Sequence, residues 1–290
     1  VALQNGLGAA LAGAFHLDPR LGLAVGSIPM VGGHGTAGAF GPVLEEAGVA
    51  GANAVAIASA TFGLVAGCMI GGPLAYRRIH SLNLKSTETA TGSDEVTVDK
   101  NEVTGAIDSR RFLDSALYLA IAIGAGTIVS LFLNKLMTFP SYIGAMVVAA
   151  IIRNIVDATH KDMPMEEIST IGSFSLSLFL GLAMMGLKLW QLAELALPMI
   201  VMLAAQTVLM AIFAYFVVFN LLGKNYDAAV MTSGFCGFGM GATPNAMANM
   251  QAITAKYGPA PTAYFVVPLV GSLFIDFFNA LIITTFMNFL

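Results

Sequence analysis

Residues 236–254 have the sequence CGFGMGATPNAMANMQAIT, and residues 26–40 have the sequence GSIPMVGGHGTAGAF. Both stretches place clustered glycines and single polar residues between apolar segments. Lipid offers no hydrogen bonds to free backbone groups, so non-helical backbone at membrane depth must face protein or a watery cavity. Glycine permits a sharp turn there and lets a ligand approach the backbone. The two stretches therefore predict two broken helices within a membrane protein.

The composition of the whole chain supports a lipid environment. Of its 290 residues, 57% are hydrophobic and 10% are charged, and the mean hydropathy is +0.80, whereas a soluble domain carries about 25% charged residues. The net charge of −4, without a dense basic cluster, argues against a nucleic-acid partner. The sequence contains no metal-ligand cluster, catalytic-triad spacing or nucleotide loop, so it does not predict an enzyme. We interpret Cys68 and Cys236 as packing residues.

Apolar stretches follow one another along most of the chain. Residues 76–111 form the one long polar stretch, which has the composition of a solvated linker. We predict complete or partial membrane spans at 1–15, 54–75, 112–134, 141–157, 168–187, 195–219 and 262–289, with broken segments at 21–47 and 227–256.

The basic residues predict the orientation of these spans. If 76–111 is cytoplasmic, alternating spans leave only Arg20, Lys135 and Lys188 outside, in agreement with the positive-inside rule. This arrangement requires each broken segment to enter and leave on one side, the first from outside and the second from the cytoplasm. The basic residues then placed inside are Arg77, Arg78, Lys85, Lys100, Arg110, Arg111, Arg153, Lys161, Lys224 and Lys256.

The two broken segments predict an internal repeat. Gly33-His34-Gly35 matches Gly237-Phe238-Gly239 at an offset of 204, and both halves have the order span, broken segment, span. An odd number of crossings between the halves inverts the second. We therefore predict an all-α polytopic membrane protein, an inverted-repeat secondary transporter with two re-entrant glycine-rich loops. It would comprise the C-terminal part of the first repeat (1–75), a cytoplasmic linker (76–111) and the second repeat (112–290). Symmetry leads us to expect roughly 90–110 residues before Val1.

Each broken segment also predicts a half-helix that starts at membrane depth. Thr243 is a suitable N-cap and Pro244 suits the first helical turn, and Thr36 can play a similar part in the first segment. The partly positive N-terminus of such a half-helix can hold a carboxylate. Because no Lys or Arg lies in mid-span, a carboxylate substrate would need this device.

Asp276 is the one acidic residue at the centre of a long apolar span. An Asp there costs about 3 kcal/mol on insertion scales, which favours a partner or a cavity. Ser272, Asp276 and Asn279 would share a helical face, and their oxygens suit a sodium ion or a substrate ammonium group. An interhelical hydrogen-bond cluster is the alternative.

Other polar residues in the apolar segments have two interpretations each. Asn245 and Asn249 share a face of the second half-helix, where they line a site or support packing. His34 binds substrate, titrates, or hydrogen-bonds within its loop. Interhelical hydrogen bonds explain Gln4, Asn5, Gln206 and Thr207 at least as well as a site does.

Five stretches together resemble the bacterial sodium/glutamate symporters: 26–40 and 236–254 above, ATFGLVAGCMIGGPLA (60–75), SLSLFLGLAMMGLKLWQLAELALPM (175–199) and KNYDAAVM (224–231). The resemblance covers nearly the whole chain except the polar linker. It implies sodium-coupled import of L-glutamate across the bacterial inner membrane by a multi-pass homodimer of the elevator type. It also implies substrate contacts at Gly32, Gly33, His34, Gly35, Thr36, Gly237, Phe238, Gly239, Gly241, Thr243 and Pro244.

Two other functions remain open from the residues. A sodium- or proton-coupled symporter of a dicarboxylate or hydroxycarboxylate could use the same architecture, although a citrate-type carrier favours an Arg in its site. A channel or a non-transporting membrane module is the alternative from another class. A channel needs a continuous pore, whereas opposed re-entrant loops suggest alternating gates.

Overall fold

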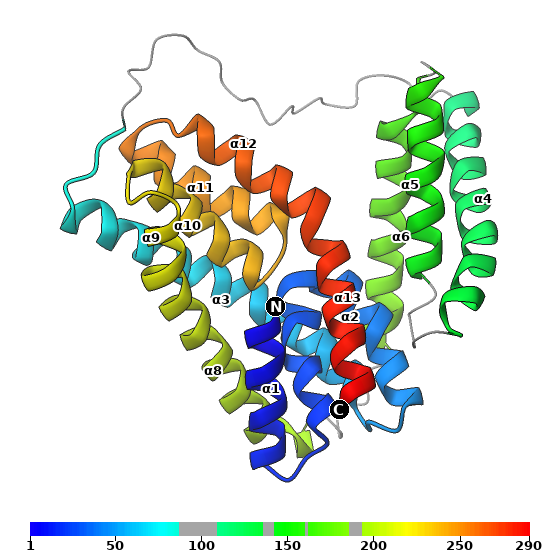
Figure 1. Ribbon diagram of the computed structural model, residues 1–290, viewed down its shortest axis with the longest axis horizontal. Helices are drawn as coiled ribbons and strands as arrows, with labels where there is room; N and C mark the ends of the chain where they lie inside the picture. Colours follow the sequence, from blue (N-terminus) through cyan, green and yellow to red (C-terminus); the bar gives the residue numbers. More distant parts are fainter. Residues whose placement is uncertain (87–108, 136–141, 160–161, 186–192) are drawn as a thin grey trace. The chain divides into compact units, whose positions relative to one another are not determined.

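The computed structural model describes residues 1–86, 109–135, 142–159, 162–185 and 193–290. All regular structure in these ranges is helical, with no strand. The chain divides into two compact units, drawn in Figure 1: unit 1 comprises residues 1–92 and 188–290, and unit 2 comprises residues 93–187. The predicted all-α architecture is confirmed for the described part of the chain.

Unit 1 contains both glycine-rich segments. Its first stretch consists of α1 (Ala2–Ala14), the 3-10 helix η1 (Pro19–Val25), α2 (Ser27–Glu46) and α3 (Ala52–Ser81). Its second stretch consists of α8 (Ala196–Phe213), η2 (Ala214–Val218), α9 (Phe219–Leu221), α10 (Tyr226–Gly239), α11 (Thr243–Tyr257), α12 (Pro261–Val270), η3 (Gly271–Ile275) and α13 (Asp276–Phe289).

The helix bounds agree closely with the predicted spans, and two π-helical turns are the main difference. The predicted continuous helices 195–219 and 262–289 contain the π turns η2 and η3. A π turn widens the i→i+4 ladder locally, and such turns are frequent at functional sites. The hydrophobic periodicity of the sequence did not predict them.

Among the described residues, three helices are long and apolar enough to cross a membrane by length and composition: Ala52–Ser81, Ser109–Leu133 and Ala196–Leu221. The first extends further than predicted, since α3 continues through Ser81. Ile79, near its end, is buried in a cluster with Phe219 and Tyr226. This tertiary packing explains why helix continues into a polar sequence. Linker residues 87–108 lie outside the described ranges.

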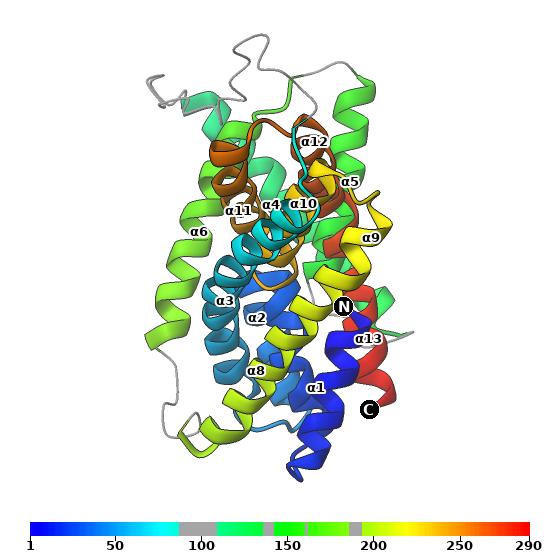
Figure 2. The same cartoon turned by 90° about the vertical axis from the view of Figure 1, so that its left-hand side faces the viewer.

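Helix α3 links the two glycine-rich segments of unit 1. It packs against α2, α10 and α11, and Figures 1 and 2 show it running beside these helices in both views. One buried cluster joins its C-terminal end to α9, α10, α11 and α12. The segment before the long linker and the segment after α8 therefore share one core.

Unit 2 is built from α4 (Ser109–Leu133), α5 (Tyr142–Ala158) and α6 (Met165–Met185). A Cβ on Gly144 would lie 2.1 Å from the Gly126 carbonyl oxygen, so α4 and α5 approach through glycine. The Gly144 N–H also donates to Ser130 Oγ at 3.1 Å. Close approach through small residues and hydroxyl bonds is typical of helix pairs in membranes.

Candidate functional site

Both glycine-rich segments fold back on themselves as helical hairpins. We call Pro19–Glu46 hairpin 1 and Tyr226–Tyr257 hairpin 2. In hairpin 1, Arg20 Nη1 donates a hydrogen bond of 3.1 Å to the Ala47 carbonyl, which joins the start of the segment to its end. Arg20 also pairs with Asp18 at 2.6 Å, and this hydrogen bond holds the pKa of the Asp18 carboxyl below its ordinary value.

Hairpin 2 closes at its base in the same manner. Tyr226 Oη, at the start of α10, donates a 2.6 Å hydrogen bond to the carbonyl of Gly258, which follows α11. Ser86 Oγ donates to the adjacent Pro259 carbonyl at 2.7 Å. The two ends of each hairpin thus lie side by side at its base, and its glycine motif lies at the opposite end, the tip.

The tips of the two hairpins meet. Gly33 has φ 59° and ψ −154°, a conformation that breaks α2 and that side chains other than hydrogen rarely permit. A Cβ on Gly33 would lie 3.1 Å from the Gly241 carbonyl oxygen of hairpin 2. Val31 and Phe238 are buried together there, with Ile275 packed against them. The predicted breaks at both glycine motifs are confirmed, and the fold brings them into contact.

Three glycines of α3 allow its backbone to lie against hairpin 2. A Cβ on Gly63 would lie 2.3 Å from the Met240 carbonyl oxygen, and one on Gly67 would lie 3.0 Å from that of Cys236. A Cβ on Gly71 would lie 2.3 Å from Asn249 Nδ2. Glycines repeating every four residues are a known signal for close helix packing, but the predictions above did not include this contact.

Asn245 and Asn249 strengthen the same contact. Asn245 Nδ2 donates to the Leu64 carbonyl at 2.9 Å, and Asn249 Nδ2 donates to the Gly67 carbonyl at 3.0 Å. Asn249 is 5% exposed and also donates to the Ser233 carbonyl at 3.0 Å. Of the two interpretations, these contacts favour packing for Asn249, whereas Asn245 stays partly exposed at the tip.

The predicted substrate-contact residues divide by exposure. Gly35 and Pro244 are exposed, and Gly32, His34, Thr36, Thr243 and Asn245 are partly exposed. Gly33, Gly237, Phe238, Gly239 and Gly241 are buried. The exposed and partly exposed residues therefore form the surface that a substrate can reach at the tips. The buried glycines shape the backbone behind this surface.

The predicted helix cap at Thr243 is wrong in detail. Helix α11 begins at Thr243 itself, Ala242 occupies the N-cap position, and no side chain caps the helix. Ala242 has the extended backbone of a cap residue (φ −165°, ψ 171°), which moves Thr243 into the helix. Pro244 lies in the first turn, as predicted. Thr36 likewise lies inside α2, three residues after the break at Gly33.

His34 is held by helix α3. Its Nε2 lies 3.0 Å from Thr61 Oγ1, and the Thr61 hydroxyl also donates to the Ile57 carbonyl at 3.3 Å. Because this hydroxyl donates to a carbonyl, it can accept from an imidazole N–H. Thr61 therefore orients His34 at the tip, a role that the sequence analysis did not anticipate.

Adjacent amides of α1 hold both hairpins. Gln4 Nε2 donates to the Gly239 carbonyl of hairpin 2 at 2.8 Å, and Asn5 Oδ1 accepts from the Ser27 N–H of hairpin 1 at 2.8 Å. Gln206 Nε2 in turn donates to the Gln4 carbonyl at 2.7 Å. The interhelical interpretation of these three amides is confirmed.

Two members of the predicted stripe Ser272–Asp276–Asn279 differ in burial, although the two lie three residues apart on α13. Asn279 is 1% exposed and donates to the Ser27 carbonyl at 3.3 Å, whereas Asp276 is exposed on unit 1. The side chain of Ser272 lies outside the described residues. The π turn at Gly271–Ile275 changes the register of Ser272 relative to α13, whereas Asp276 and Asn279 keep their α-helical spacing. Asp276 directly follows Ile275, which packs at the hairpin tips.

Buried oxygen atoms near the start of α2 remain available for a ligand. Ser27 Oγ and Asn279 Oδ1 lack a hydrogen-bond partner among the described residues, as does Asn5 Nδ2. In the described part of the chain, no three His, Cys, Asp or Glu side chains gather as a metal site. Asp276 lies on the same helix as Asn279, three residues before it.

Comparisons with known proteins agree with the sequence resemblance. A family model described as sodium/glutamate symporter matches residues 1–259. The sodium/glutamate symporter of Escherichia coli (strain K12) is 43% identical over 292 aligned positions, which cover 98% of this chain and 72% of that protein. The one of Haemophilus influenzae is 37% identical over 285 positions, with 96% and 70% covered. No solved structure matches the chain.

Proposed function

The chain belongs to the sodium/glutamate symporter family, and from this membership we propose that it carries L-glutamate together with sodium across a membrane. Sodium is then a transported ion rather than a resident cofactor. The apolar helices α3, α4 and α8–α9 suit a membrane protein. We extend the proposal to a multi-pass homodimer in the bacterial inner membrane.

The observation that carries this proposal is the pair of hairpins with closed bases and touching tips. A transported solute needs a site that one gate can open to each side in turn, and two opposed re-entrant segments supply two gates. The bonds Arg20–Ala47 and Tyr226–Gly258 return each hairpin to its starting point, as re-entrant segments require. We propose that unit 1 moves as the transport body of an elevator-type carrier.

We propose that glutamate binds on the exposed side of the tips. The start of α11 offers backbone N–H groups and the positive end of a helix dipole to a carboxylate. Thr243 and Asn245 are partly exposed there, and on hairpin 1 Gly35 is exposed and His34 is partly exposed. Asp276 directly follows Ile275, which packs at the hairpin tips. Its carboxylate can balance the positive charge of a sodium ion or of the substrate ammonium group.

A counterflow experiment tests the function. Proteoliposomes loaded with unlabelled glutamate should accumulate labelled glutamate when sodium is present, and should lose this exchange when potassium replaces sodium. Exchange that ignores sodium would contradict the proposal. Uptake of labelled citrate or malate in place of glutamate would instead support the carboxylate-carrier alternative.

A pair of matched variants tests the site separately. Thr243→Val removes a partly exposed hydroxyl at the start of α11. We expect glutamate binding to weaken roughly 10- to 150-fold, since a hydrogen bond to a charged group contributes roughly 1.5–3 kcal/mol. Thr285→Val makes the same change where the hydroxyl bonds only within its own helix, to the Leu281 carbonyl at 2.8 Å. If the two variants bind glutamate with equal affinity, the substrate does not contact Thr243. That result would contradict the proposed binding site but not the proposed transport activity.

A further inference from the structure

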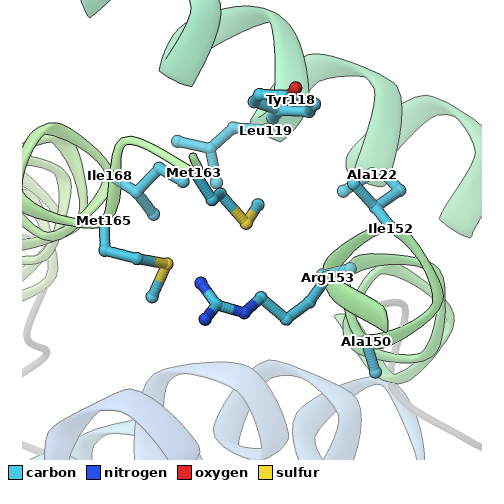
Figure 3. Close-up of a pocket in the computed structure, with 10 residues that line it drawn as sticks. Tyr118, Leu119, Ala122, Ala150, Ile152, Arg153, Met163, Met165 and Ile168 are labelled. Atoms are coloured by element: carbon cyan, nitrogen blue, oxygen red, sulfur yellow. The ribbon is translucent and has the colours of Figure 1, made fainter. Parts of the chain in front are cut away.

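Unit 2 encloses a cavity that the transport site does not use. Its volume is about 290 Å³, and it opens among α4, α5 and α6. Figure 3 shows its apolar wall, which includes Leu119, Ala122, Met163 and Ile168, and shows the Arg153 side chain extending across it toward Met165. The cavity therefore has an apolar interior and one guanidinium group.

A second, polar cavity of about 410 Å³ adjoins the first and shares Arg153, Met163 and Met165 with it. Its further lining includes Arg111, Asp157, Asp162 and Glu166. The apolar cavity thus leads into a mouth that carries both signs of charge, with three carboxylates and two guanidinium groups.

The ion pairs within the mouth do not involve all of its charged groups. Arg111 bonds Asp162 at 2.8 Å and Glu167 at 2.9 Å. Arg153 uses its Nε toward Asp157 at 2.9 Å. Within the described residues, no hydrogen bond or ion pair reaches the two terminal nitrogens of Arg153 or the Glu166 carboxylate. The Arg153 guanidinium can therefore donate hydrogen bonds to an anionic group of a ligand, and the Glu166 carboxylate can accept them from a cationic group of the same ligand.

The depth of the cavity fits a membrane lipid. Leu119 and Ala122 follow Arg111 by eight and eleven residues on α4, which corresponds to about 12–17 Å along a helix. The charged mouth is at one end of α4, and the apolar cavity begins within that distance. An amphiphile with its headgroup at the mouth would place an acyl chain among these residues.

We propose that unit 2 binds one zwitterionic phospholipid with a primary ammonium, of the phosphatidylethanolamine class. Its phosphate bonds the terminal nitrogens of Arg153, its ammonium faces Glu166, and one acyl chain occupies the apolar cavity. The excess of acids at the mouth disfavours an anionic lipid. A choline headgroup has no N–H to donate, so it satisfies the free carboxylate less well. This inference depends on the membrane setting and not on the identity of the transported solute.

The test compares lipid retention by the parent protein and two arginine variants. Each protein is purified from nanodiscs made of equal parts of phosphatidylethanolamine, phosphatidylcholine and phosphatidylglycerol, and native mass spectrometry counts the bound lipids. We expect one phosphatidylethanolamine per parent chain. Arg153→Ala should reduce its retention by more than about tenfold, because the variant loses both charge-assisted hydrogen bonds to the phosphate. Asp157, its exposed partner, makes little contribution to folding, so this variant should fold.

Arg110→Ala is the matched control, because Arg110 lies next to Arg111 in α4 and is not among the residues that line either cavity. It should retain phosphatidylethanolamine as the parent does. A second variant, Ala122→Phe, fills the apolar cavity and should also expel the lipid. Equal retention by Arg153→Ala and the parent would overturn the proposal, as would equal retention of all three lipid classes. Chain-to-chain crosslinking through Ala150→Cys in place of lipid binding would overturn it too.

Discussion

Gly33 offers the sharpest test of the hairpin-tip geometry. Its φ of 59° and ψ of −154° lie in a region that is essentially open only to glycine, and a side chain there costs about 1–3 kcal/mol. A Cβ would also approach the Gly241 carbonyl oxygen to 3.1 Å, so the tips would have to separate slightly. Gly33→Ala should therefore strain the contact between the two hairpin tips.

The expected size of the effect follows from these terms. Alanine restricts the unfolded chain and returns about 0.4–1 kcal/mol, which leaves a net destabilisation of about 1–2 kcal/mol. For a domain of this size, that loss lowers the thermal midpoint by about 2–8 °C. If the intact tip is needed for transport, sodium-dependent uptake should fall about tenfold for each 1.4 kcal/mol.

Gly35→Ala provides a control two residues away. A Cβ on Gly35 meets nothing within 4 Å, and its φ is not in the positive range. Because Gly35 lies in helical backbone, alanine there should be neutral or stabilise the protein by about 0.5–1 kcal/mol. The same chemical change should thus shift stability in opposite directions at the two positions.

The assay is a thermal unfolding measurement in detergent, with glutamate uptake by proteoliposomes beside it. A Gly33→Ala protein with the parent's thermal midpoint and uptake would refute the positive-φ conformation of Gly33 at the tip. A Gly35→Ala protein that loses as much stability as Gly33→Ala would show that the effect comes from any added methyl group rather than from the backbone conformation.

Asp276→Asn should express normally, because Asp276 is exposed and has no described partner. The variant should lose transport, or its transport should depend less on sodium. Uptake with the parent's sodium dependence would show that Asp276 takes no part in sodium coupling. In a Cys68→Ala background, single cysteines at Glu46 and Lys85, both exposed, should react with an impermeant reagent from opposite faces of the membrane, with Lys85→Cys cytoplasmic. Labelling of both from outside would contradict the orientation predicted from the basic residues.

Local sequence signals predicted most helices and both breaks. The spans 54–75, 112–134 and 195–219 correspond to the three long apolar helices, with α3 extended at its C-terminal end. The break at Gly33 and the gap between Gly239 and Thr243 lie within the predicted glycine motifs. These predictions succeeded because each helix in lipid must satisfy its own backbone, which makes apolar length and glycine position local properties.

Site assignments that assumed a regular helix were less successful. The stripe through Ser272, Asp276 and Asn279 assumed one continuous α-helix, but Ser272 lies in the π turn at Gly271–Ile275, and Asp276 is exposed while Asn279 is buried. The cap at Thr243 assumed that a good cap residue decides the helix start, whereas the extended backbone at Ala242 does so. Neither feature has a local sequence signal strong enough to predict it.

The sequence alone determined the membrane class, the helix order, the two breaks and the family resemblance, since these depend on composition and on neighbours within a few turns. Only the tertiary structure decided which groups meet across the chain. Gln4 bonds Gly239 over 235 residues, and Asn249 bonds Gly67 over 182. Many amides in an apolar segment could make such bonds, and packing selects among them. The closed hairpin bases and the contact of Gly33 with Gly241 likewise arise from the fold, because no local interaction specifies distant partners.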